Sequence, residues 1–191
     1  MRPPRLIAMA WLAVLVFPLS LTGCAPGRDL PPLPSRLNGA YRLGPGDAVR
    51  ILTHGEEPLT GEFRVSDQGT IALPLLGTVR ASGETPSGLG EKIVAALKKD
   101  DVLKKPSVSV EVTTYRPIYV LGEVNKPGQY PYHPGMTMVT AAAVAGGFTY
   151  RAVEDYAGVV RTVDGDSVEG KASRQASLRP GDVITVFERR F

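Results

Sequence analysis

Two copies of one short phrase limit how this chain can fold: LGPGDAVRI at residues 43–51 and LRPGDVITV at residues 178–186. In each copy, proline sets φ at about −65° and the next glycine permits the positive φ that a type II turn needs. The apolar residues after the aspartate predict a strand launched by the turn. Pro-Gly also occurs at 127–128 and 134–135, so the turn chemistry alone is not distinctive. The position of the copies predicts the first strand of one small domain and the last strand of another, rather than a paired active site.

The length of 191 residues permits one large domain or two small ones. The 21 glycines and 17 prolines divide the chain with frequent turns, which favours β-rich modules over helix bundles. The formal net charge of +3 is too small to indicate a nucleic-acid partner. No run of Lys and Arg interleaved with aromatic residues supports such a partner either, so nucleic-acid binding is excluded from the expected functions.

Residues 1–23 have the pattern of a secretory signal peptide. Arg2 and Arg5 precede an apolar run from Leu6 to Phe17, which is shorter than the roughly 20 residues that a bilayer-spanning helix needs. The run leads into Leu-Thr-Gly-Cys at 21–24, which resembles the lipobox of bacterial lipoproteins, where the cysteine receives diacylglycerol and becomes the first mature residue. Cys24 is the only cysteine and has no disulfide partner within the chain, so we predict that it is the lipid attachment site.

The residue after Cys24 is alanine, not the aspartate that retains many such lipoproteins in the inner membrane. This resemblance implies an outer-membrane anchor, with the protein facing the periplasm. Residues 25–40 hold four prolines and few large apolar groups, which predicts a semi-rigid tether rather than part of a core. Such a segment extends about 50 Å as polyproline II, at about 3.1 Å per residue. We therefore expect a lipidated N-terminus and flexible tether over residues 24–40.

The first folded unit is expected over residues 41–115. Ala48–Thr53 is its first predicted strand, and GEFRVSDQGTIALPLLGTV at 61–79 predicts two strands joined by a hairpin at Asp67-Gln68-Gly69. The regular alternation of SVSVEVTTY at 107–115 predicts a half-buried strand.

A helix is expected between these strands. Thr85 is its predicted N-cap and Pro86 its first residue, because proline needs no N–H partner there. Lys98 and Lys99 fall in the last turn, where cations suit the helix dipole. The apolar residues that share its inward face are Leu89, Ile93, Ala96 and Leu97.

The second unit is expected over residues 116–191. The segment RPIYVLGEV predicts a first strand that ends at Gly122, and NKPGQYPY predicts a turn followed by a return strand. The segment GMTMVTAAAVAGG predicts a helix with Thr137 as its N-cap. A hairpin is predicted in YAGVVRTVDGDSVEG and a last strand in LRPGDVITVFE. The order of strands and helices predicts an α+β fold of two small β-rich domains, the second of them β-grasp-like.

Catalytic and metal-binding patterns are missing from the sequence. The only histidines, His54 and His133, lack metal-ligand spacing, and HGEE at 54–57 is not the zinc-binding HExxH. No serine sits in a GxSxG elbow, and neither GPGDAV nor SGLGEK satisfies the dinucleotide or P-loop spacing. We therefore expect surface or turn positions for both histidines, and no enzyme activity, cofactor or metal.

Taken together, the motifs resemble those of the outer-membrane polysaccharide export lipoproteins, the OPX or Wza-type family. YRLGPGDAVRI at 41–51 resembles the opening of the poly-export domain, and VSDQGTIALPLLGTV at 65–79 resembles its next signature. Three further segments resemble the SLBB module, a soluble-ligand-binding β-grasp domain: VLGEVNKPGQYPY, TAAAVAGGFTYRA and LRPGDVITVFE. These motifs follow one another in family order and cover nearly all of the chain after Cys24.

This resemblance implies a conduit for a secreted polymer rather than an enzyme. Family members assemble as homo-oligomeric rings in the periplasm, meet an inner-membrane co-polymerase that is often coupled to a tyrosine kinase, and pass polysaccharide outward. The positions that match family motifs, besides the lipid-bearing Cys24, are Gly46, Asp47, Gly122, Pro127, Gly128, Gly146, Gly147, Gly181 and Asp182. We expect these residues to shape the backbone, since glycine permits positive φ and aspartate caps turns.

One departure from the longer members concerns the C-terminus. Those members form an outer-membrane pore from a C-terminal amphipathic helix of each subunit, whereas this sequence reaches ERRF directly after its last predicted strand. The sequence therefore resembles the short form of the family, with one SLBB module, and implies that a separate outer-membrane β-barrel completes the route.

Two other functions stay open at this point. One is a monomeric, lipid-anchored binding protein whose β-grasp domain captures a small soluble ligand. The other is a polysaccharide-modifying enzyme, which needs a pair of carboxylates in a cleft.

Overall fold

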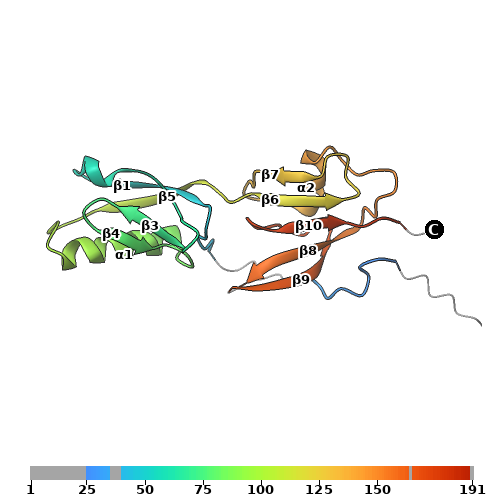
Figure 1. Ribbon diagram of the computed structural model, residues 1–191, viewed down its shortest axis with the longest axis horizontal. Helices are drawn as coiled ribbons and strands as arrows, with labels where there is room; N and C mark the ends of the chain where they lie inside the picture. Colours follow the sequence, from blue (N-terminus) through green and yellow to red (C-terminus); the bar gives the residue numbers. More distant parts are fainter. Residues whose placement is uncertain (1–24, 35–39, 164, 190–191) are drawn as a thin grey trace, which may run out of the picture.

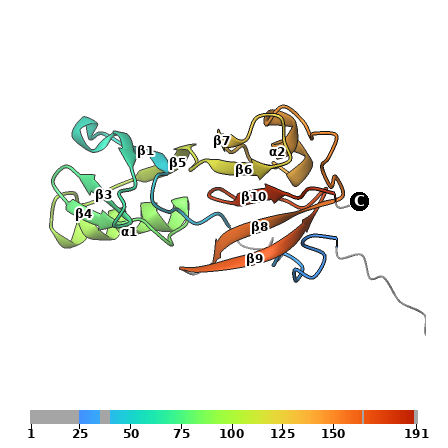
Figure 2. The same cartoon turned by 45° about the vertical axis from the view of Figure 1, so that its right-hand side comes forward.

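The computed structural model describes residues 25–34, 40–163 and 165–189, so the predicted signal peptide and the predicted lipid attachment site, Cys24, lie outside the described residues. Two β-rich units lie end to end (Figures 1 and 2). Each has its own cluster of buried residues, one drawn from residues 43–97 and the other from Leu33 and residues 118–186. No helix within these described ranges is long and apolar enough to cross a membrane. The expected α+β fold of two small β-rich domains is confirmed.

The first unit contains a three-stranded antiparallel sheet with β1 (Ala48–Thr53) between β2 (Gly61–Arg64) and β5 (Val108–Thr114). The short 3-10 helix η1 (Glu57–Leu59) connects β1 to β2. A second, two-stranded sheet is formed by β3 (Thr70–Leu73) and β4 (Gly77–Arg80). The alternation predicted for β5 is observed, because its residues alternate between half-buried and exposed positions.

The hairpin predicted at Asp67-Gln68-Gly69 is wrong. The residues do turn the chain, since Gly69 N donates to Ser66 O (2.8 Å), but β2 pairs with β1 and β3 pairs with β4. The hairpin of this region instead reverses at residues 74–76, between β3 and β4. Turn composition shows where a chain bends, whereas strand pairing depends on which neighbours the rest of the fold supplies.

The helix α1 (Pro86–Lys99) covers β5 and begins as predicted. Thr85 Oγ1 accepts a hydrogen bond from Gly88 N (3.0 Å), and Pro86 is the first helical residue. Of the predicted inward residues, Leu89, Ile93 and Leu97 are buried and Ala96 is half-buried.

The second unit is a five-stranded sheet in the order β7-β6-β10-β8-β9. Its strands are β6 (Ile118–Gly122), β7 (Gly128–Tyr130), β8 (Tyr156–Val163), β9 (Asp166–Ser173) and β10 (Val183–Val186). The last strand, β10, runs parallel to the first, β6, at the centre of the sheet, while the other pairs are antiparallel. This arrangement is the β-grasp-like roll that the sequence predicts.

The helix α2 (Met138–Val144) packs Met138, Ala141 and Ala142 into the second core. Its start is fixed by Thr137 and Thr140: Thr137 N donates to Thr140 Oγ1 (2.7 Å), and Thr140 N donates to Thr137 Oγ1 (3.4 Å). The predicted cap at Thr137 is therefore confirmed.

Residues 25–34, which we call the N-terminal strap, differ from the free tether that their composition predicts. The strap runs along the edge strand β9 (blue in Figures 1 and 2). Leu33 N donates to Lys171 O (2.9 Å), and Lys171 N donates to Pro31 O (2.7 Å). Leu33 itself is only 8% exposed and belongs to the second core. The strap is thus a structural part of the second unit.

Two glycines leave space for the strap and its neighbours. A Cβ on Gly170 would lie 2.7 Å from Leu33 Cα, and one on Gly158 would lie 2.9 Å from the Phe187 ring, which in turn packs against Gly27. Proline content misleads as a predictor here, because a segment at a sheet edge needs few backbone donors and a single leucine can anchor it.

Candidate functional site

The two Pro-Gly-Asp turns of the sequence have the same backbone geometry in the structure. Gly46 has φ of 93° and Gly181 has φ of 87°, both in the region that favours glycine. In each turn the aspartate N–H donates to the carbonyl three residues earlier, over 3.2 Å for Asp47 and 3.1 Å for Asp182. Both are therefore type II turns, as the sequence predicts.

Each aspartate side chain also closes its own turn. Asp47 Oδ2 accepts from Gly44 N (2.8 Å), and Asp182 Oδ2 accepts from Arg179 N (2.7 Å). The two carboxylates are 0% and 1% exposed. A buried carboxylate is stable only when donors satisfy its oxygens, so the remaining partners of each aspartate decide its role.

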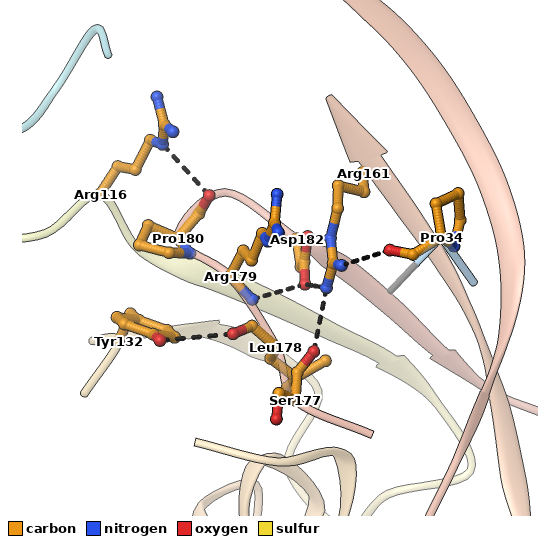
Figure 3. Close-up of polar contacts among 9 residues, drawn as sticks. All are labelled: Pro34, Arg116, Tyr132, Arg161, Ser177, Leu178, Arg179, Pro180 and Asp182. Atoms are coloured by element: carbon orange, nitrogen blue, oxygen red, sulfur yellow. Dashed lines mark hydrogen bonds and ion pairs between the residues drawn. The ribbon is translucent and has the colours of Figure 1, made fainter. Parts of the chain in front are cut away.

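Arg116 joins the two turns across the boundary between the units. Its backbone N donates to Asp47 Oδ1 (2.8 Å), and its Nε donates to Pro180 O (3.1 Å), the contact drawn at the upper left of Figure 3. Gly181 N donates in turn to Pro117 O (3.0 Å). A side chain at Gly44 would displace the Arg116 guanidinium from the position that it has in the structure. The two copies of the repeated phrase therefore meet at one place, around Arg116, which we call the junction.

Asp182 is held by a buried arginine of its own unit. Arg161, on β8, donates from Nε to Asp182 Oδ1 (2.9 Å) and from Nη2 to Asp182 Oδ2 (2.6 Å). It also donates from Nη2 to Ser177 O (3.1 Å) and from Nη1 to Pro34 O (3.4 Å), as Figure 3 shows. Arg161 is 2% exposed. This ion pair thus connects the β10 turn, the β9–β10 loop and the strap.

Three tyrosines line the same junction. The rings of Tyr41 and Tyr115 meet edge to face with centroids 5.0 Å apart, and those of Tyr115 and Tyr132 do so at 5.5 Å. The Tyr41 hydroxyl donates to Asp47 Oδ2, and the Tyr132 hydroxyl donates to Leu178 O (3.3 Å). The tyrosine row therefore links the first unit, the connecting segment and the second unit.

Burial in this junction shifts three pKa values. Burial, and then the hydrogen bond to Asp47, raise the pKa of the Tyr41 hydroxyl far above its ordinary value. Burial raises the pKa of Tyr132, and nearby Tyr115 adds to the effect. Burial, followed by repulsion from Arg161, lowers the pKa of the Arg179 guanidinium. All three shifts reflect exclusion of water from the junction.

The other predicted motif residues lie away from the junction, at the opposite end of β6. Gly122 passes so close to Val186 O that a side chain there has no space. The segment with Pro127 and Gly128 turns into β7, and residues 125–126 pair with the stretch containing Gly146 and Gly147 through backbone hydrogen bonds. Those two glycines have positive φ, whereas Gly128 does not.

Several residues of the junction were missed by the sequence reasoning. Arg161 carried a usable signal, because it is the one charge in the alternating strand YAGVVRTV and falls on the inward side with Ala157 and Val159. Arg116 carried a weaker one, since Tyr-Arg occurs before the first turn and at the unit boundary, but also at 150–151, away from both. A charge at an inward strand position requires a buried partner, and this rule points to an aspartate such as Asp182.

The hydrogen bonds of the junction satisfy both aspartates and connect the two units. Protein donors occupy both oxygens of Asp47 and of Asp182, so neither carboxylate is available as a base or nucleophile. His54 and His133 are exposed, and within the described residues no group of three or more His, Cys, Asp or Glu side chains could hold a metal ion.

Two protein-family models match the chain in the order of its two units. Residues 35–113 match the model described as polysaccharide biosynthesis/export protein, and residues 117–172 match the SLBB domain. The first match ends inside β5 and the second begins one residue after Arg116. The junction therefore lies where the two matched domains meet.

Three curated relatives illustrate the similarity. They are the exopolysaccharide production protein ExoF of Rhizobium meliloti (strain 1021), 36% identical over 118 residues; the EPS I polysaccharide export outer membrane protein EpsA of Ralstonia solanacearum, 36% over 105 residues; and the polysialic acid transport protein KpsD of Escherichia coli, 30% over 95 residues. The alignments cover 56%, 53% and 49% of this chain, but 28%, 27% and 17% of the relatives. The chain thus matches less than a third of the length of each relative.

Proposed function

We propose that the chain is a member of the polysaccharide biosynthesis/export family and a non-enzymatic component of a machine that exports an exopolysaccharide or capsular polysaccharide. The observation that carries this proposal is the order of the two matched domains, poly-export and then SLBB, in one chain. The names of the three relatives, which refer to exopolysaccharide production, polysaccharide export and polysialic acid transport, support the same class of cargo.

The junction between the units supports a conduit role. In this proposal the poly-export domain spans residues 41–115, and the SLBB domain spans residues 116–191 with the N-terminal strap packed on it. Arg116 and the three tyrosines connect the two domains and limit their relative orientation. A subunit of a larger assembly needs a fixed orientation of its domains, because each domain has to contact the same surface of the neighbouring subunit.

We place the protein at the outer membrane, anchored by lipid on Cys24 and facing the periplasm. The lipobox-like sequence supports the anchor, and the name of EpsA, an outer membrane protein, supports the membrane. Because the strap is docked on the second unit from Pro26 onward, the proposed lipid attaches close to that unit.

The proposed partners are the polysaccharide itself, further copies of this chain in a homo-oligomeric ring, an inner-membrane co-polymerase and a separate outer-membrane β-barrel. The ring is the central element of the proposal, since a single copy of this size cannot enclose a polymer.

Gene deletion in the native bacterium tests the proposed function. We expect loss of secreted polysaccharide, measured as extracellular uronate and hexose, and recovery by the unaltered gene. The variant Cys24→Ser lacks the proposed lipid attachment site. We expect it to be produced at the normal level but to be absent from the outer-membrane fraction. Unchanged polysaccharide secretion in the deletion strain would falsify the proposal.

The cavity beside the strap, described below, favours a second candidate function: a monomeric, lipid-anchored protein that binds a small soluble ligand. Native mass spectrometry of the lipidated protein in detergent separates the two. A ring of identical subunits supports export, and a strictly monomeric species at high concentration supports the second candidate.

A further inference from the structure

A cavity of about 620 Å³ lies in the second unit between the N-terminal strap and the strands β8 and β9. Its volume falls in the range of about 300–1,000 Å³ that is usual for small-molecule sites. No family motif position lines the cavity, and it shares with the junction only Arg161 and the two residues whose carbonyls Arg161 binds, Pro34 and Ser177. The lining residues used below are Arg28, Asp155, Tyr156, Arg161, Lys171 and Gln175.

The charges around the cavity favour an anionic ligand. Arg161 is neutralised by its ion pair with Asp182. The other charged lining residues are Arg28 and Lys171, which are positive, and Asp155, which is negative. None of the ion pairs among the described residues includes Arg28 or Lys171. The excess of positive charge therefore attracts an anion.

The remaining walls suit a sugar ring. Tyr156 contributes an aromatic ring, and the Lys171 ammonium lies 6.0 Å from the centre of that ring. Pro32, Leu33 and Ala176 add apolar surface. Asp155 and Gln175 add groups that can bond to hydroxyls. A carboxylated sugar matches all three kinds of wall. Its ring can lie on the aromatic face, its hydroxyls can bond to the polar side chains, and its carboxylate can pair with a cation.

We infer that this cavity binds a carboxylate-bearing saccharide, such as a uronic acid unit or a short oligouronide. The carboxylate faces Lys171 and Arg28, and the ring lies against Tyr156. A simple inorganic anion leaves most of the volume and the apolar wall unused, and a neutral sugar gives neither cation an anionic partner.

This inference rests on the proposed export function and deepens it, because it assigns an acidic polysaccharide as the cargo. The strap forms one wall of the cavity, so the segment next to the proposed lipid anchor takes part in the site. Lys171 Nζ donates to Arg28 O (3.0 Å), which ties the strap to β9 at the cavity wall.

Binding of tetragalacturonic acid to the purified full chain tests the inference. The methyl ester of the same oligosaccharide and maltotetraose serve as uncharged probes. We expect NMR shift changes at Tyr156 and its neighbours with the acid alone, weakening as salt is added. Lys171→Gln and Arg28→Gln should each weaken binding about tenfold, as loss of a charge-assisted hydrogen bond predicts. The matched control is Lys105→Gln, an exposed lysine of the first unit, which should leave binding unchanged.

Lys171 also holds the strap, so Arg28→Gln decides the question if Lys171→Gln lowers the melting temperature. Equal shifts with the methyl ester, shifts outside the cavity, or no shifts at millimolar concentration would overturn the inference. If polysaccharide secretion depends on the gene while the acid does not bind, the cavity assignment is wrong and the export proposal remains. If secretion does not depend on the gene, the export proposal itself is wrong, whatever the oligosaccharide does.

Discussion

The two Pro-Gly-Asp turns share a sequence, a backbone and a capping hydrogen bond, but their aspartates bind different partners. Asp47 is held by neutral donors, the Tyr41 hydroxyl and the backbone N of Arg116. Asp182 is held on both oxygens by the buried guanidinium of Arg161. The first aspartate thus connects its unit to the segment between the units, and the second stabilises the interior of its own unit.

This difference shows that one local motif can serve two structural roles. The turn requires only glycine at positive φ and an aspartate that reaches back to the first residue of the turn. The remaining acceptor positions of each carboxylate bind the donors that the surrounding fold provides. A charged partner makes the aspartate costly to remove, because the partner stays behind in the interior.

The largest effect is expected for Asp182→Ala. The substitution leaves Arg161, which is 2% exposed, without its counter-ion, and loss of one member of a buried pair costs about 3–5 kcal/mol. Chemical denaturation followed by circular dichroism measures the free energy of unfolding. The double variant Arg161→Met with Asp182→Leu should regain most of the loss, since no buried charge remains. Equal losses for Asp182→Ala and Asp47→Ala would remove the distinction between the two turns.

A smaller loss, about 2 kcal/mol, is expected for Asp47→Ala, because its partners are uncharged donors that are in part accessible to water. Hydrogen exchange should localise the loss to the first unit and to the segment around Arg116. Asp47→Asn keeps one acceptor oxygen and should fall between the parent and Asp47→Ala. Faster exchange confined to the second unit would contradict the assignment of Asp47 to the junction.

Arg116→Ala should change stability by only about 1 kcal/mol, since it removes a single side-chain hydrogen bond to Pro180 O. Its main effect should be a wider range of angles between the two units, measured as the distance distribution between spin labels placed on α1 and β9. Arg42→Ala is the matched control, because Arg42 donates to Gly83 O within the first unit. An unchanged distribution in Arg116→Ala would show that the tyrosine row and the backbone hydrogen bonds of Arg116 N and Gly181 N hold the units without the Arg116 side chain.

The smallest effect is expected in alkaline solution. The pKa of Tyr41 is raised in the folded state above its ordinary value of 10.0, so the folded chain keeps a proton that the unfolded chain releases. Stability from this source is complete below about pH 10 and falls as the pH rises further. Tyr41→Phe should show a shallower decline in unfolding free energy between pH 9 and pH 11, with Tyr132→Phe as the comparison. Parallel declines in the parent and Tyr41→Phe would show that Tyr41 has no part in it.

Much of the candidate site follows from the sequence. The motif matches predict Gly46, Asp47, Gly181 and Asp182 as backbone-shaping residues, and the structure places all four at the junction. The sequence does not predict their partners, because Arg161 and Arg116 are not local to the turns in the chain. The composition of the strap predicts a tether, whereas its docking depends on space left by Gly158 and Gly170 on distant strands.

Local sequence is enough to specify the two type II turns, the caps at Thr85 and Thr137, and the alternating strand β5. These features depend on φ preferences and on hydrogen bonds within a few residues, so they do not require contacts with distant parts of the chain. Long-range contacts, in contrast, determine that the turns meet at Arg116, that β2 pairs with β1 rather than β3, and that Pro26 docks against Tyr156. Those contacts join residues as far apart as 69 positions for Arg116 and Asp47 and 130 for Tyr156 and Pro26, and no local preference fixes such a pairing.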